Sequence, residues 1–342
     1  MGVLPTRRGA HRVGQNDVGR VVVSSASTIA GAPGRADILA MDRVIRPNIR
    51  RTPIVRVPID VGGITTTSSL TLKLEQLQCS GSFKARGAFA NLLTRDVPSS
   101  GVIAASGGNH GVAVAYAAAQ LGVRAHIFIP TVAAAQKVDL IRRLGAELVI
   151  AGDRYSDALA AAEAFAADDE ALPVHAFDQW ETIAGQGTLA VELAQQAPDI
   201  TTVLVPVGGA GLIAGIAAYY GGAVRVIGVE PTGAPTLTRA RAAGAPIDAP
   251  TGSIAADALA PRRVGLLTFA ITQRYVNDVV VVDDAAIADA QQALWEHLRV
   301  IAEPAAAVGL AALRVGAYRP ASGEHVAVVI TGANGRSPTA PQ

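Results

Sequence analysis

The sequence predicts an α/β fold built on mostly parallel sheets, and three observations support this prediction. The chain has 342 residues, of which 50% are hydrophobic and 17% are charged, so it can form two folded domains. Short apolar runs rich in valine and isoleucine recur along it, each bounded by glycine, proline or aspartate on at least one side. Alanine-rich stretches of helical length separate these runs. This alternation is typical of βαβ units.

The apolar runs have the length and the branched side chains of buried parallel strands. They comprise residues 102–105, 125–129, 148–151, 203–207, 224–229 and 326–331. The helices expected between them comprise residues 110–121, 135–144, 156–167, 182–196 and 212–220. Residues 70–76 alternate leucine with polar residues, which predicts a strand exposed on one face. The Pro- and Gly-rich stretch 231–250 predicts an irregular surface excursion.

Composition argues against several classes of function. The formal net charge is +1 without a basic block, so neither nucleic acid nor an anionic membrane surface is expected as a partner. No apolar stretch is long enough to span a bilayer. The single Cys79 excludes an intrachain disulfide and a multi-cysteine metal site, and it fits a cytoplasmic protein. Residues 1–33, which arginines interrupt, are expected as a flexible N-terminal tail rather than a signal peptide, and residues 337–342 as a frayed tail.

The first segment with chemical potential is 80–88, which contains Lys84. It opens an expected helix, and an amine near the positive end of the helix dipole is less readily protonated. Schiff-base chemistry requires such a neutral amine. The chain has two other lysines: Lys73 in the alternating strand, and Lys137 in a helix where we expect it to be solvated. Taken alone, segment 80–88 also fits a surface lysine at an ordinary helix start.

Three Gly-rich turns follow expected strands, and ligands of open α/β sheets bind at the carboxyl ends of strands. In residues 105–111, consecutive N–H groups form an anion nest, to which Ser106 and Asn109 add polar side chains. Residues 207–212 suit a phosphate at a helix N-terminus, although the loop lacks the lysine of a P-loop. Residues 329–335 place the hydroxyl of Thr331 at the end of the last strand. Each turn alone also fits a purely structural role.

Together, the four segments resemble the fold-type-II pyridoxal-phosphate enzymes, particularly the threonine/serine dehydratases and the closely similar serine racemases. The resemblance runs from about residue 38 to residue 334. It is carried by Ser82-Phe83-Lys84, Gly108-Asn109-His110, the Gly208 loop, Thr331, and the stretches 183–188, 229–231, 253–257 and 303–304. It implies two open, mostly parallel twisted sheets flanked by helices, as in the tryptophan synthase β-subunit.

The resemblance also implies a role for each matching residue. Lys84 would form the Schiff base with the cofactor and then act as the acid/base, while Phe83 would pack beside the cofactor ring. Asn109 would hydrogen-bond the ring hydroxyl, and Thr331 would meet the ring nitrogen. The phosphate would be held by the loop residues Gly208, Gly209, Ala210, Gly211 and Leu212. The substrate carboxylate would be bound by the loop residues Ser106, Gly107, Gly108, Asn109 and His110.

Three positions depart from the pattern of this family. Ala210 stands where glycine is commonest, and its methyl group should fit if φ is negative there. Thr331 stands where serine is common. Thr236 stands where metal-binding relatives carry an acidic residue near Glu230, which leaves Glu230 as the remaining candidate ligand for a divalent cation.

The resemblance implies a large cofactor-binding domain, residues 34–99 and 178–336, and a small mobile substrate domain, residues 100–177. The expected substrate is a small amino acid and the expected assembly is a homodimer. The expected reaction converts L-threonine, L-serine or both to 2-oxobutanoate or pyruvate and ammonia.

Three alternatives remain open at this point. The first is a racemase of serine or another small amino acid. In serine racemases a serine before the Gly-Asn-His triplet returns the proton, whereas Gly107 stands here, so we expect dehydration over racemisation. The second is a β-replacement enzyme, in which threonine usually follows the asparagine where His110 stands here. The third is a non-catalytic binding protein, against which Lys84 argues.

Overall fold

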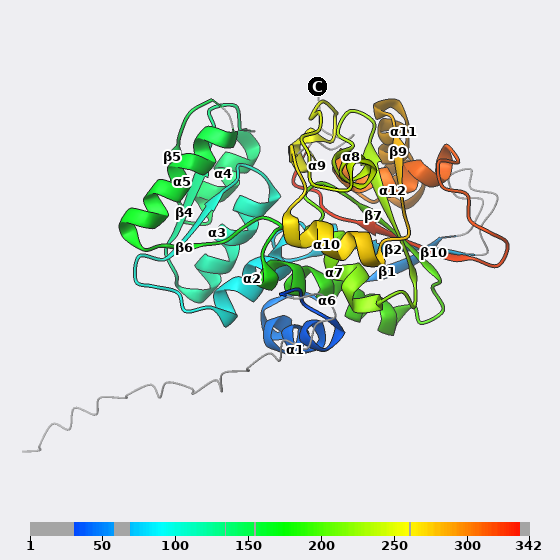
Figure 1. Cartoon of the computed structure of the whole chain (residues 1–342), viewed down its shortest axis with the longest axis horizontal. Coiled ribbons are helices and arrows are strands. Elements are labelled where there is room, and N and C mark those ends of the chain that lie inside the picture. The colour runs from blue at the N-terminus through cyan, green and yellow to red at the C-terminus, as the bar shows by residue number, and fades with distance from the viewer. Residues whose placement is uncertain (1–30, 58–68, 134, 154, 260, 336–342) are drawn as a thin grey trace, which may run out of the picture.

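The computed structural model contains two β-sheets, each flanked by helices and each in its own lobe (Figure 1). It describes residues 31–57, 69–133, 135–153, 155–259 and 261–335. The larger sheet has the strand order β1-β2-β10-β7-β8-β9, and the smaller one β5-β4-β3-β6. Among the described strands, β1 pairs antiparallel with β2, and the other neighbouring strands are parallel. The predicted pair of open, mostly parallel sheets is therefore confirmed.

The strands of the larger sheet are β1 (Ile54–Val57), β2 (Ser69–Leu74), β7 (Thr202–Pro206), β8 (Arg225–Pro231), β9 (Asp278–Val282) and β10 (His325–Ile330). The helices of this lobe are α1 (Arg35–Ile45), α2 (Lys84–Thr94), α6 (Trp180–Gln196), α7 (Gly211–Tyr220), α8 (Thr236–Ala243), α9 (Ala256–Leu259), α10 (Leu266–Tyr275), α11 (Asp284–Leu298) and α12 (Pro304–Arg314). Two 3₁₀ turns accompany them, η1 (Arg46–Asn48) and η2 (Glu75–Leu77).

Helices cover both faces of the larger sheet, so its inner strands β2, β10, β7 and β8 are buried on both sides, whereas the edge strands β1 and β9 are partly exposed. On one face, Leu70 and Leu72 of β2 join the apolar cluster of α11 and α12. On the other face, Val203 and Val205 of β7 join the cluster of α1, α2, α6 and α7. Burial on both faces explains why these strands appear in the sequence as continuous apolar runs.

The smaller lobe contains the strands β3 (Val102–Ala105), β4 (Ala125–Ile129), β5 (Glu147–Ile150) and β6 (Leu172–Pro173). Its helices are α3 (Asn109–Leu121), α4 (Ala135–Arg143) and α5 (Tyr155–Asp169). Figure 1 shows these helices flanking the small sheet at a distance from the larger one. No helix in the described part of the chain is long and apolar enough to cross a bilayer.

Three local expectations are wrong. The strand at residues 70–76 is not exposed on its polar face, since Thr71, Lys73 and Glu75 are all buried. The stretch 231–250 is not irregular throughout, because it contains α8, which packs against the sheet through Leu237. The expected N-terminal tail ends earlier than residue 33, since Ala32 is buried. The rest of that tail, and residues 337–342, lie outside the described residues.

Candidate active site

Lys84 is the first residue of α2 and is half-buried near the segment that joins the two lobes. Its Nζ donates a hydrogen bond to the carbonyl oxygen of Ala176, 2.7 Å away, between β6 and α6. Loss of solvent around the amine lowers the pKa of Lys84 to about 8. A substantial fraction of this amine is therefore neutral at mildly alkaline pH, and the neutral form is the nucleophile.

The end of β10 lies against the start of α2. The backbone N–H of Phe83 donates to the carbonyl oxygen of Thr331 over 3.1 Å, and Ser82 forms an isolated bridge with Gly332. Thr331 is buried. The structure thus places Thr331 next to the residues that precede Lys84, although the two segments are far apart in the sequence.

The loop 208–211 leads from β7 into α7 and is buried. Its residues present backbone N–H groups at the start of a helix, where an anion is stabilised. Ala210 has φ = +69°, which is left-handed backbone. The expectation of a negative φ at Ala210 is therefore wrong, and the alanine carries the steric cost that glycine avoids.

Phe177 packs directly on this loop. A Cβ atom added to Gly209 would lie 2.3 Å from the Phe177 ring, so glycine is required for the close approach. Because Phe177 follows Ala176, the hydrogen-bond acceptor of Lys84, the loop and the lysine lie close together. The pattern of glycines in the sequence indicated this loop, but no pattern indicated Phe177 as its partner.

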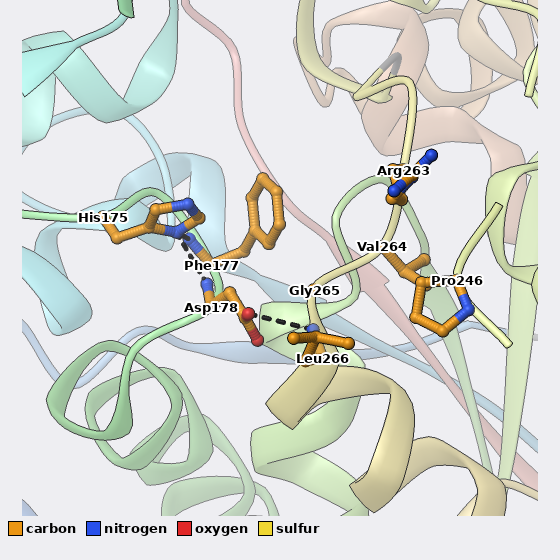
Figure 2. A pocket seen from close by; sticks show the side chains of 8 residues that line it. All are labelled: His175, Phe177, Asp178, Pro246, Arg263, Val264, Gly265 and Leu266. Carbon is orange, nitrogen blue, oxygen red and sulfur yellow. Dashed lines mark hydrogen bonds between the residues drawn. The ribbon is translucent and has the colours of Figure 1, made fainter. Parts of the chain in front are cut away.

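The segment 175–178 also forms one wall of a cavity of about 350 Å³ (Figure 2). The opposite wall is made by residues of the larger lobe, namely Pro246, Arg263, Val264, Gly265 and Leu266. Asp178 fixes this wall, since its carboxylate accepts backbone N–H groups at the start of α10. Neither Lys84 nor the loops 106–110 and 208–211 line this cavity, so it adjoins the candidate site only through the segment 175–178.

The loop 106–110 opens α3 in the smaller lobe. The hydroxyl of Ser106 accepts the N–H of Gly108 at 3.2 Å, which orders the turn. His110 is buried, and its Nε2 lies 2.9 Å from the carbonyl oxygen of Val174, so Nε2 carries the hydrogen. Burial and the nearby Lys84 lower the pKa of His110 to about 3. His110 is therefore neutral and cannot serve as a proton donor in its charged form at physiological pH.

The backbone of Gly107 fixes the direction that a side chain at this position would take. A Cβ atom added to Gly107 would lie 2.7 Å from the Cβ of Ala133 and 3.5 Å from a methyl of Ile129. A serine there would consequently point towards these two residues of the smaller lobe, and Ala133 or the loop would have to move to admit it.

Asn109 is held at both ends of its side-chain amide. Its Nδ2 donates to Oε1 of Glu303 over 2.6 Å, and its Oδ1 accepts from Nδ2 of Asn334 over 3.0 Å. Glu303 and Asn334 belong to the larger lobe, where the N–H of Glu303 donates to the carbonyl oxygen of Gly332, the residue after Thr331. The resemblance included Glu303-Pro304, but a function for Glu303 was missed. The sequence shows only a glutamate before Pro304, and its burial against Asn109 is visible only in the tertiary structure.

Lys137 is not solvated, contrary to expectation. Its side chain is 1% exposed, and its Nζ bonds to Asp257 of α9 and lies 4.0 Å from Oε2 of Glu303. The pair joins α4 of the smaller lobe to α9 of the larger lobe. The exposed arginines of the same helix, Arg142 and Arg143, suggested a solvated face that Lys137 does not share.

Glu230 caps the start of α8. Its carboxylate accepts the N–H of Leu237 at 2.6 Å and both the N–H and the hydroxyl of Thr238. Burial raises the pKa of Glu230. The described residues contain no group of three or more His, Cys, Asp or Glu side chains that could hold a metal ion. Thr236, where an acidic partner would be needed, is buried and donates to Pro261.

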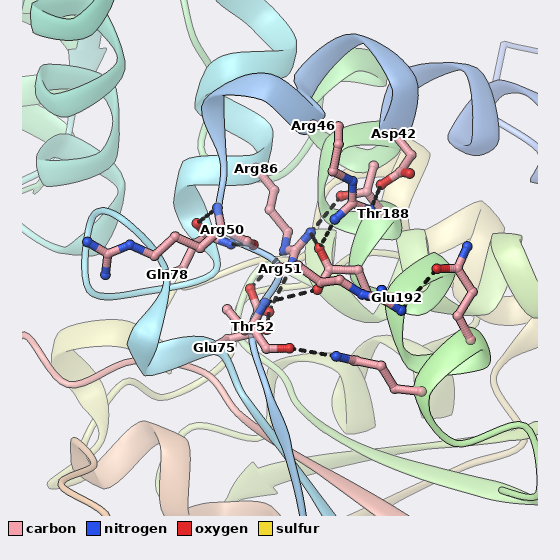
Figure 3. Close-up of polar contacts among 12 residues, drawn as sticks. Asp42, Arg46, Arg50, Arg51, Thr52, Glu75, Gln78, Arg86, Thr188 and Glu192 are labelled. Atoms are coloured by element: carbon pink, nitrogen blue, oxygen red, sulfur yellow. Dashed lines mark hydrogen bonds and ion pairs between the residues drawn. The ribbon is translucent and has the colours of Figure 1, made fainter.

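A buried charge cluster lies behind α2, defined by Lys73, Glu75, Arg86 and Glu192. Figure 3 shows Arg86 between Glu75 and Glu192. All four side chains are 0% exposed, and their formal charges cancel. Lys73 donates to Glu192 at 2.7 Å, and Arg86 donates to Glu75 at 2.8 Å and to Glu192 at 3.1 Å. Arg86 is two residues from Lys84, so the cluster fixes the first turn of α2.

Comparison with known proteins gives a consistent result. The family described as Pyridoxal-phosphate dependent enzyme matches residues 45–332. The biosynthetic L-threonine dehydratase of Escherichia coli K12 is 40% identical over 271 residues, which cover 78% of this chain and 53% of that protein. The chain therefore spans about half the length of that relative.

Two solved structures resemble the chain over most of its length. Maize serine racemase has a TM-score of 0.84 and 33% identity, covering 89% of this chain and 94% of that one. The threonine deaminase of T.th. has a TM-score of 0.83 and 35% identity, covering 90% of this chain and all of that one (100%).

Proposed function

The chain belongs to the family of pyridoxal-phosphate-dependent enzymes, and we propose that it dehydrates and deaminates L-threonine, L-serine or both to a 2-oxo acid and ammonia. The observation that carries the proposal is Lys84, an amine with its pKa lowered to about 8, beside a Gly-rich loop at the start of a helix. A cofactor with an aldehyde and a phosphate needs both features in one place.

The residues present fit this cofactor. Lys84 supplies the amine, and Gly208, Gly209, Ala210 and Gly211 supply backbone donors for the phosphate, followed by Leu212 at the first turn of α7. The loop contains no basic side chain, so the anion would be held by N–H groups and the helix dipole. Phe83 and Thr331 adjoin Lys84, which supports their roles beside the ring and at the ring nitrogen.

The substrate-facing residues are those of the loop 106–110. We assign Ser106, Gly107, Gly108, Asn109 and His110 to the substrate carboxylate, because this turn presents backbone N–H groups at the start of α3. When bound, the cofactor withdraws electrons from the α-carbon of the substrate. Lys84 can then take the α-proton, since its amine is neutral in part at mildly alkaline pH. His110, neutral and bonded to Val174, can orient the loop.

The assignment of domains is part of the proposal. Residues 100–177 would close over the substrate against residues 34–99 and 178–336, and the Lys84–Ala176 contact would lie at their junction. We further propose that the protein is a cytoplasmic homodimer. Its substrate would be a small amino acid, and it would have no nucleic-acid partner. Its single Cys79 and its net charge of +1 support the compartment and the lack of a nucleic-acid partner.

Covalent capture tests the central residue. Borohydride reduction of the protein loaded with pyridoxal phosphate, followed by peptide mapping, should label Lys84. Lys73 and Lys137 are matched internal controls, because both are buried amines already engaged with carboxylates. Label on either of them would contradict the assignment.

Serine racemisation is the second candidate, and the 33% identity to maize serine racemase favours it. The two activities differ in one requirement, an acid/base on the face of the cofactor opposite Lys84. A side chain at position 107 would point towards Ala133 and Ile129, which argues against that position as the source.

A further inference from the structure

A chain of buried polar groups connects Asn109 with both lobes, and its centre is Glu303. This residue precedes α12 and is 3% exposed. One carboxylate oxygen, Oε1, accepts from Asn109 at 2.6 Å. The other, Oε2, is buried without a hydrogen-bond partner among the described residues and lies 4.0 Å from Nζ of Lys137. A buried carboxylate in this state needs a compensating charge.

Lys137 supplies that charge from the other lobe. Its ammonium group bonds to Asp257, whose side chain is 48% exposed, and it faces the fully buried side of Glu303. Among the described residues, the charged groups that act on Glu303 are Lys137 from α4 and Asp257 from α9; the contacts with Asn109 and the backbone of Gly335 are neutral. Lys137 is therefore the cation that balances Glu303.

The ionisation of Glu303 decides how Asn109 is held. An ionised carboxylate accepts only, so it must face the NH₂ end of the Asn109 amide. Asn334 donates to the oxygen end, which agrees with this orientation. A protonated Glu303 could also donate a hydrogen bond. The Asn109 amide could then be turned by 180° and accept that hydrogen bond through its oxygen, so this contact would no longer fix its orientation.

We propose that Lys137 and Glu303 are positioning residues, in which Lys137 balances the buried carboxylate of Glu303 and that carboxylate fixes the Asn109 amide for the cofactor. The inference rests on the proposed function and on the role that the family resemblance implies for Asn109, a hydrogen bond to the ring hydroxyl of the cofactor. It also makes the site depend on the placement of the two lobes, because Lys137 comes from one and Glu303 from the other.

The direction of the charge effects supports this reading. Burial raises the pKa of Glu303, whereas Lys137 and the hydrogen bond from Asn109 lower it and Asp257 raises it. Removing the charge of Lys137 would raise the pKa of Glu303 further, so that the carboxyl group is protonated over a wider range at low pH. The orientation of Asn109 would then be lost as pH falls.

The test is the affinity of the apoprotein for pyridoxal phosphate, measured by fluorescence titration from about pH 6 to about pH 9. We expect Lys137→Met to bind about 10- to 100-fold more weakly at the acid end, the range for losing a hydrogen bond to a charged group, and to recover towards alkaline pH. Lys137→Arg, which keeps the charge, should restore most of the affinity. Arg142→Met on the same helix is the matched control and should behave as the unaltered protein.

A double variant separates positioning from simple cross-linking of the lobes. Glu303→Gln cannot ionise, so Lys137→Met combined with Glu303→Gln should lose the pH dependence of Lys137→Met. Two results would overturn the inference: unchanged affinity of Lys137→Met at every pH, or a pH-independent loss that adds to that of Glu303→Gln. If Lys137→Met does not fold, Lys137→Gln takes its place. Failure of the unaltered protein to bind the cofactor at all would instead reject the proposed function.

Discussion

Replacing Glu192 by glutamine should destabilise the protein severely, because Glu192 balances the buried charge cluster behind α2. Its carboxylate accepts hydrogen bonds from three basic side chains, Lys73 at 2.7 Å, Arg86 at 3.1 Å and Arg46 at 2.7 Å. Without it, the two fully buried cations, Lys73 and Arg86, face a single buried anion, Glu75. Glutamine keeps the size of the side chain, so the variant changes charge with little change in packing.

The magnitude follows from the electrostatics of Glu192. Burial alone raises its pKa, but Arg86 and Lys73 outweigh burial and lower it from 4.5 to about 2. That difference corresponds to about 3 kcal/mol of favourable interaction with the charged form. Breaking a buried pair by removing one partner costs about 3–5 kcal/mol. The two values agree, and either is a large part of the roughly 5–15 kcal/mol that stabilises a folded protein.

Urea unfolding of the apoprotein, followed by circular dichroism, measures the loss. Asp199→Asn is the matched control, because Asp199 pairs with Arg56 at the surface, where the side chains are 37% and 49% exposed. It should cost at most about 1 kcal/mol. A loss for Glu192→Gln no larger than that of the control would refute the reasoning.

The same experiment has a predicted pH dependence. The folded-state pKa of Glu192 is lowered, so its contribution is complete above the unfolded value of about 4.3 and is lost as pH falls to about 2. The difference between the two proteins should therefore shrink across this acid range. A difference that stays constant there would show that Glu192 does not act through its charge.

Four further outcomes follow. Ala210→Gly should raise the free energy of unfolding by about 1 kcal/mol, because it removes the steric cost of left-handed backbone at an alanine. The control Ala160→Gly, on the exposed face of α5, should lower that free energy by about 1 kcal/mol, because glycine is a poor helix former; thermal unfolding measures both. Gly209→Asp should weaken cofactor binding strongly, through the clash with the Phe177 ring and the added negative charge, and unchanged affinity would place the phosphate elsewhere. Loading of the apoprotein with cofactor should speed up as pH rises through about 8, where Lys84 becomes neutral; a rate independent of pH would contradict this. Gly107→Ser should not raise serine racemisation, because its side chain points into the smaller lobe, and a clear gain in D-serine would show that the loop moves.

Much of the fold could be predicted from the sequence, because burial on both faces leaves a visible apolar run. The runs 102–105 and 125–129 coincide with β3 and β4. Three strands were missed: β6 has two residues, β1 is half-buried, and β9 is largely outside the buried core at the sheet edge. Short or edge strands lack the full apolar signature.

Both misread lysines have the same physical cause. Lys73 follows the alternating pattern of a half-exposed strand, and that pattern is identical whether the polar face meets water or buried partners. Its partner Glu192 is 119 residues away in the sequence. Lys137 meets Asp257, 120 residues away. Only the tertiary structure shows that a charged side chain is paired across such a distance.

The sequence indicated the residues expected to touch the cofactor more fully than the residues that pack against them or hold them in place. Lys84, the loop at Gly208 and Thr331 stand at the ends of strands or starts of helices, which leave Gly-rich or polar signatures. Phe177 and Glu303 leave none, because an aromatic residue and a glutamate are common in any segment. The sign of φ at Ala210 is likewise set by the packing of its loop rather than by local sequence.

The most direct test of the account is the product formed from small hydroxy amino acids. Purified protein loaded with pyridoxal phosphate is given L-threonine, L-serine or D-serine, and both 2-oxo acid and the opposite enantiomer are measured. The account predicts 2-oxobutanoate or pyruvate, with ammonia, from an L-substrate much faster than any enantiomer appears, and neither product from Lys84→Ala. Interconversion of L- and D-serine that is faster than pyruvate formation would contradict it.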